Sequence, residues 1–233
     1  MSLALLCLHV EIVFALLILV FFVFGIVRKN KSSNFDLEVF NFAIFIIGAI
    51  FFLLQSFYAD MVSFVTIGCF NCFVLTKFII LAKIFVLSVF GVFILIHFFV
   101  KDASCPYFEF VLLTLLSVLG GFFLLMVYDL MVLYLSLELQ SLVLYVLPIV
   151  LCISGNFPRE ASFKYFIFGS IASSFILLGI SFIYGFCGFT SFRELETFFK
   201  FDSIFGIEFR FLIGILFVFL GILFKMGIVP FHY

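Results

Sequence analysis

Apolar residues fill most of the chain in long runs that polar clusters interrupt only briefly. A helix needs ~20 mainly apolar residues to cross the hydrocarbon core of a bilayer. Seven runs approach this length, at residues 7–27, 39–58, 78–100, 108–128, 130–151, 165–186 and 209–230. The alternating pattern of barrel strands is absent, and backbone groups in hydrocarbon must be paired within the spanning segment. The pattern therefore predicts an all-α, polytopic membrane helix bundle of about seven transmembrane helices.

Two further segments do not fit this pattern of spans. Residues 61–76 are apolar, but Gly68, Asn71 and the nearby Lys77 interrupt them, so we expect this segment at the membrane surface. Residues 188–208 form the longest polar connection. We interpret the first run as a retained helix, because the residues around it lack the basic start and small-residue cleavage site of a signal peptide.

The composition supports a membrane location and excludes several classes of protein. The chain is 67% hydrophobic and 11% charged, with a mean hydropathy of +1.47, whereas soluble domains are about half apolar and a quarter charged. The net charge of -1 offers no basic patch for nucleic acid. Phe occurs 43 times and Trp never, and we interpret this as the coding bias of an A+T-rich organellar genome.

Glu138 lies inside the predicted helix 130–151, where a charge costs on the order of 3 kcal/mol on insertion scales. Tyr134, Glu138, Ser141 and Tyr145 fall on one helical stripe, the last three at four, seven and eleven residues after Tyr134. A polar residue can simply join helices by hydrogen bonding, but Gln or Ser would do so at lower cost. The pattern favours a proton-handling role for Glu138.

Lys225 lies near the end of the predicted helix 209–230. Gly214 and Gly221 fall on its face of the helix, so that a neighbouring helix could approach closely. Gly227 and Pro230 are expected to break the helix just beyond it, and broken helices at membrane depth are where transporters build ion sites. The alternative is that the long side chain snorkels to an interface, and the sequence leaves both interpretations open.

The other ionisable and metal-binding residue types give weaker signals. We expect Lys83 and His97, near the ends of their span, to snorkel, and Glu11 to face water. Lys164, at the start of the predicted helix 165–186, is equally compatible with snorkelling and with a polar role inside the membrane. One C-x-x-C pair, Cys69 and Cys72, lacks the second ligand pair of a zinc site. We expect no metal, no cofactor and no soluble-type catalytic centre.

Three blocks of sequence resemble one known family. They read YDL and LELQSLVLY at 128–130 and 137–145, EASFKYFIFGS at 160–170, and FKMGIVPFH at 224–232. Their order and spacing resemble NADH dehydrogenase subunit 2, the antiporter-like membrane subunits of respiratory complex I. The resemblance covers residues 122–233, and before them only the number of hydrophobic helices agrees.

The resemblance implies a proton-translocating subunit of NADH:ubiquinone oxidoreductase in the mitochondrial inner membrane, with no redox chemistry in this chain. It implies that Glu138, Lys225 and Lys164 take part in proton translocation. Residues 107–233 would form the first part of the antiporter-like proton channel repeat, helices four to seven, and end in a discontinuous helix. Residues 1–106 would form helices one to three. The implied partners are lipids and other membrane-arm subunits of complex I.

The chain departs from the family in one respect. The family continues past the Phe-His pair with a Trp-x-Pro-Asp stretch, an eighth helix with a second lysine, and an inverted second half, whereas this sequence stops at Tyr233. We therefore expect a second polypeptide that supplies the remaining helices. The alternatives are a truncated, non-pumping bundle that scaffolds a membrane complex, and a subunit of a cation/proton antiporter.

Overall fold

Seven helices and two short strands make up the described part of this computed structural model, which comprises residues 2–28, 66–68, 72–99, 107–151, 157–201 and 209–228. The helices are α1 Ser2–Arg28, α3 Lys77–Phe99, α4 Tyr107–Leu125, α5 Leu130–Leu151, α6 Phe157–Cys187, α7 Phe192–Phe201 and α8 Phe209–Lys225. The strands are β1 Thr66–Gly68 and β2 Phe73–Leu75.

The helices confirm the predicted all-α membrane architecture. Six of the seven predicted spans contain a helix, and the seventh, residues 39–58, lies outside the described residues. Among the described residues, α3, α4, α5 and α6 are the four helices whose length and composition suit a membrane crossing. Shorter apolar stretches lie in α1 and α8, at Glu11–Val23 and Phe211–Lys225.

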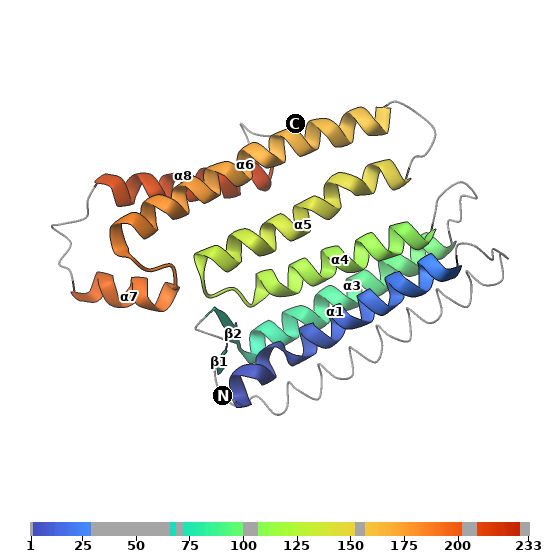
Figure 1. Ribbon diagram of the computed structural model, residues 1–233, viewed down its shortest axis with the longest axis horizontal. Coiled ribbons are helices and arrows are strands. Elements are labelled where there is room, and N and C mark those ends of the chain that lie inside the picture. Colours follow the sequence, from blue (N-terminus) through green and yellow to red (C-terminus); the bar gives the residue numbers. More distant parts are fainter. Residues whose placement is uncertain are drawn as a thin grey trace.

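The long helices pack in sequence from one side of the bundle to the other (Figure 1). Helices α1 and α3 both contact α4, α4 contacts α5, and α5 contacts α6, which forms the most extensive pair with α8. A first core lies among α1, α3 and α4, around Phe14, Phe110 and Phe122. A second lies among α5, α6, α7 and α8, around Ile176 and Ile180.

Small residues let α6 and α8 approach closely. A Cβ at Gly214 would lie 3.0 Å from the carbonyl oxygen of Gly179, and one at Gly221 would lie 2.8 Å from that of Ala172. The structure thus confirms the predicted close approach along the face that carries Lys225. Because Lys225 follows Gly221 by one turn, this contact fixes where its side chain begins.

The connection 188–208 contains an amphipathic helix, α7, in place of the expected polar loop. The Ser191 hydroxyl accepts a hydrogen bond of 3.4 Å from the backbone N–H of Glu194, which is the serine–glutamate spacing of a helix-capping box. Leu195 and Phe198 pack against the second core. The sequence did not predict this helix, because its 10 residues are too few for a membrane span and several of them are charged.

The segment 61–76, expected at the surface, contributes to the core in its described part. Strands β1 and β2 pair antiparallel, and the backbone N–H of Val74 donates to the carbonyl oxygen of Met126 at 2.9 Å. Leu75 is buried with Met126 and Ile80. The ribbon therefore packs against the end of α4.

Candidate functional site

The start of α5 is fixed by Asp129, one residue before the helix. Its Oδ1 accepts the backbone N–H of Met131 at 2.7 Å, and its Oδ2 accepts the Thr190 hydroxyl at 2.9 Å. The first bond caps unpaired backbone donors at the helix start. The second ties the start of α5 to the segment that precedes α7. Glu138 follows more than two turns later, in the middle part of the helix.

The end of α8 is set by Gly227, just after Lys225. Gly227 has a φ of 63°, in the left-handed region that favours glycine. The backbone N–H of Ile228 donates to the Leu223 carbonyl at 3.3 Å, and that of Gly227 to the Phe224 carbonyl at 3.2 Å. These bonds form a Schellman motif, a common helix end. The helix therefore ends at Lys225, in agreement with the break expected at Gly227. Pro230 lies outside the described residues.

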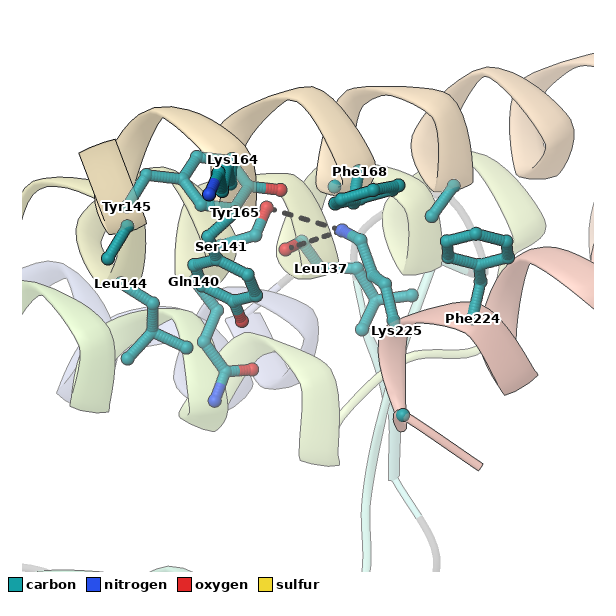
Figure 2. A pocket seen from close by; sticks show the side chains of 14 residues that line it. Leu137, Gln140, Ser141, Leu144, Tyr145, Lys164, Tyr165, Phe168, Phe224 and Lys225 are labelled. Atoms are coloured by element: carbon teal, nitrogen blue, oxygen red, sulfur yellow. Dashed lines mark hydrogen bonds between the residues drawn. The ribbon is translucent and has the colours of Figure 1, made fainter. Parts of the chain in front are cut away.

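Lys225 reaches from α8 to three oxygen atoms of α5. Its Nζ donates to the Leu137 carbonyl oxygen at 3.0 Å and to the Ser141 Oγ at 3.3 Å, and Figure 2 shows both bonds. It also lies 3.5 Å from the Glu138 Oε2. The side chains of Lys225 and Glu138 are 13% and 27% exposed. These two residues therefore face each other, and the ammonium points into the bundle instead of snorkelling.

The end of α8 adds to the electrostatic environment of Lys225. The last carbonyl groups of a helix carry a partial negative charge, and Lys225 is the last residue of α8. A cation at this position interacts favourably with these carbonyl groups. The site therefore combines one cation, one carboxylate and several fixed dipoles.

A cavity of about 530 Å³ lies beside the ion pair, among α5, α6 and α8 (Figure 2). Its polar lining comes from Gln140, Ser141, Tyr145, Lys164, Tyr165 and Lys225, and the remainder is mainly apolar. The ring of Tyr145 packs edge-on against that of Tyr165, with 5.0 Å between the ring centroids. The cavity therefore offers polar groups on two helices next to the ion pair.

Lys164 lines the same cavity as Lys225 but has a different charged partner. Its Nζ lies 2.7 Å from the Glu160 Oε1, one turn earlier in α6, and both side chains are more than half exposed. The structure thus brings Glu138 and Lys225 into contact and leaves Lys164 paired with Glu160 on α6. The proton-translocating role of all three remains a prediction.

The expectations for Glu11 and Lys83 are wrong. Both side chains are only 1% exposed, and the Lys83 Nζ donates a hydrogen bond to the Glu11 Oε1. The Lys83 Nζ also lies 2.8 Å from the Met126 Sδ. Packing of α1 and α3 against α4 buries both residues, although each lies near an end of its predicted span. The side chain of His97 lies outside the described residues.

The sequence also gave no separate role to Ser141 or to the carbonyl group of Leu137. Both bind Lys225 directly. The available signal was their spacing: Leu137 and Ser141 lie four residues apart, which places them on the same side of the helix. Only the position of α8 identifies the cation that they bind.

Known proteins are similar to this chain in both sequence and fold. The chain is 43% identical over 135 residues to "NADH-ubiquinone oxidoreductase chain 2" of Marchantia polymorpha, which covers 57% of this chain and 27% of the relative. It is 30% identical over 229 residues to "NADH-quinone oxidoreductase subunit N" of Granulibacter bethesdensis, which covers 95% of this chain and 44% of that relative. The chain thus spans less than half the length of these relatives.

A solved structure supports the fold over nearly the whole chain. It is that of the membrane-bound sulfane sulfur reductase, an archaeal respiratory membrane complex, with a TM-score of 0.71 at 19% identity over 99% of this chain and 46% of the other. Residues 127–233 match the family model described as "NADH:quinone oxidoreductase/Mrp antiporter, TM". The match over these residues, together with the similar relatives, confirms the resemblance of the chain to NADH dehydrogenase subunit 2.

Proposed function

We propose that this chain is a proton-translocating part of the membrane arm of NADH:ubiquinone oxidoreductase, with Glu138 and Lys225 as the titrating pair. The observation that carries the proposal is the 3.5 Å contact between the Glu138 carboxylate and the Lys225 ammonium, which joins two helices inside the bundle. A charge within the membrane costs on the order of 3 kcal/mol on insertion scales. Unlike the more deeply buried pair of Glu11 and Lys83, this pair borders a cavity that is lined by further titratable side chains.

The ion pair provides a means of releasing a proton. A neighbouring carboxylate stabilises the Lys225 ammonium, and separating the two in a medium of low dielectric constant removes that stabilisation. The Nζ–H bond of Lys225 then breaks, the amine keeps the electron pair, and the proton passes to an acceptor in the adjacent cavity. Lys164 lines this cavity, and we propose that it takes part in the transfer.

The setting of this activity is part of the proposal. The relatives are named as subunits of NADH-ubiquinone and NADH-quinone oxidoreductases, so we propose lipids and other membrane-arm subunits of complex I as partners. The 43 Phe residues and the absence of Trp support an organellar gene and a location in the mitochondrial inner membrane. The second polypeptide and the division of the chain at residue 107 stay predictions, and mass spectrometry of the complex purified in mild detergent tests the former.

The test uses Glu138→Gln and Lys225→Met in the assembled complex. Each substitution keeps the approximate size of the side chain and removes its titrating group, so packing should change little. NADH-driven proton transport in sealed vesicles, measured with a pH-sensitive dye, should fall strongly in both variants, and by less in Lys164→Met. Lys200→Met is the matched control, because Lys200 is 67% exposed on α7 and pairs with Glu196.

The outcomes separate the alternatives. Normal proton transport in both assembled variants would make Glu138 and Lys225 structural residues and favour a scaffold. Transport that needs a sodium gradient and continues without NADH would favour a cation/proton antiporter. Loss of transport in Lys200→Met as well would show that the assay responds to any loss of a lysine.

A further inference from the structure

The ammonium of Lys225 has two uncharged partners in addition to Glu138. The Leu137 carbonyl oxygen and the Ser141 Oγ lie at 3.0 and 3.3 Å from its Nζ, both closer than the Glu138 Oε2 at 3.5 Å. All three belong to α5, one turn or less apart. The cation is therefore held to α5 by more than its counter-ion.

The proton of the Ser141 hydroxyl is already committed. The Ser141 Oγ donates to the Glu138 carbonyl oxygen, one turn earlier, at 3.0 Å. A hydroxyl group has one proton to donate and two lone pairs that accept. With its proton on its own helix, the Ser141 Oγ presents only lone pairs to Lys225, so it acts as an acceptor.

The Leu137 carbonyl is also an acceptor without a proton of its own. Acceptors bind an ammonium more strongly than a neutral amine, because hydrogen bonds from an ionised donor are about twice as strong. Ser141 is buried, with 7% of its surface exposed, and lines the cavity beside Lys225. These two groups therefore favour the protonated lysine even when Glu138 is neutral or displaced.

We propose that Ser141 is a positioning residue for Lys225: it retains the ammonium form at α5 and sets the pH at which Lys225 releases its proton. This inference rests on the proposed function, because it assigns Ser141 a part in the same proton transfer. It explains why a serine one turn from Glu138 faces α8. Its removal should change the pH dependence of transport and leave the fold intact.

Other titratable groups lie around Lys225 and must be kept constant. Glu138 and Tyr145 face it from α5, and Lys164 and Tyr165 line the shared cavity from α6. Substitution of Ser141 alone leaves all four in place. A comparison of Ser141→Ala with Ser141→Thr then isolates the hydroxyl group.

The chain provides a matched control in Ser136 on the same helix. Its hydroxyl donates to the Leu133 carbonyl at 2.9 Å, the same type of bond that Ser141 makes to its own helix, and Ser136 is also buried. Five residues of helix separate the two serines, so they face different sides of α5. Ser136→Ala therefore removes an equivalent buried hydroxyl away from Lys225.

The experiment measures NADH-driven proton transport against pH in vesicles that contain the assembled complex. In Ser141→Ala the alkaline limb of the profile should move to lower pH by about one pH unit, a tenfold change, as expected for one lost hydrogen bond to a charged group. Ser141→Thr should restore the wild-type profile, and Ser136→Ala should leave it unchanged. If Ser141→Ala does not assemble, Ser141→Cys provides a weak acceptor of similar size and should show the same shift.

Three results would overturn the inference. These are an unshifted profile in Ser141→Ala, an equal loss of transport at every pH, and an equal shift in Ser136→Ala. If Lys225→Met still abolishes transport in these cases, the proposed function stands and only the role of Ser141 is wrong. Normal transport in both Glu138→Gln and Lys225→Met would instead reject the proposed function itself.

Discussion

The buried pair of Glu11 and Lys83 leads to a prediction about stability. Both side chains are 1% exposed, and they join α1 to α3. Removal of one member of a buried ion pair leaves an uncompensated charge and costs about 3–5 kcal/mol, whereas replacement of both by apolar residues is often neutral or stabilising. Glu11→Leu and Lys83→Met should therefore each destabilise the protein strongly. The double variant should have a free energy of unfolding close to that of the wild type.

The neighbours of Lys83 limit the loss in Glu11→Leu. The Met126 Sδ remains 2.8 Å from the ammonium, and the centroid of the Phe122 ring lies 6.0 Å away. A cation over an aromatic ring gains about 0.5–2 kcal/mol, and sulfur is a weak acceptor. Glu11 gains nothing comparable in Lys83→Met, because its Oε2 has no hydrogen-bond partner in the described structure. The lysine substitution should therefore be the more harmful of the two.

The measurement is the free energy of unfolding of the full chain in lipid bicelles, for the wild type, both single variants and the double variant. The exposed pair of Glu196 and Lys200, 62% and 67% exposed, provides the control cycle and should show a much smaller coupling, as is usual for surface pairs. The reasoning is refuted if the losses in the two single variants add up in the double variant. It is also refuted if the single variants are as stable as the wild type.

Three further predictions concern other parts of the fold. Gly221→Ala should weaken the contact of α8 with α6 and lower proton transport. Gly185→Ala should have neither effect, because a Cβ there meets no atom within 4 Å. Thermal unfolding and transport assays compare the two variants. Asp129→Ala should cost about 1 kcal/mol through the lost helix cap, measured by unfolding in bicelles. The hydrogen bond from Lys200, together with its charge, holds the pKa of Glu196 below its usual value. The contribution of this pair to the stability of the fold is therefore present above the ordinary glutamate pKa and is lost as the pH falls through the lowered pKa. Lys200→Met should raise the pKa of Glu196 towards its ordinary value in an NMR titration of labelled glutamate.

The sequence by itself determined which segments form the long helices. Helix α5 has the predicted bounds, Leu130–Leu151, and α3 and α4 start within one residue of the prediction. Segment length and the need to pair the backbone in hydrocarbon decide this, and both can be read along a single chain. For the same reason, Glu138 and Lys225 were recognisable as residues that require a polar partner.

Only the tertiary structure decided which polar groups meet. Glu11 and Lys83 lie 72 residues apart in sequence, and the bond from Lys225 to Ser141 spans 84 residues. Helices that are apolar around most of their circumference give little indication of which face turns inwards. The rotation of each helix is set by its neighbours, as where Gly221 admits the backbone of α6. Burial and partners are therefore properties of the packed bundle, whereas the helices themselves are properties of the chain.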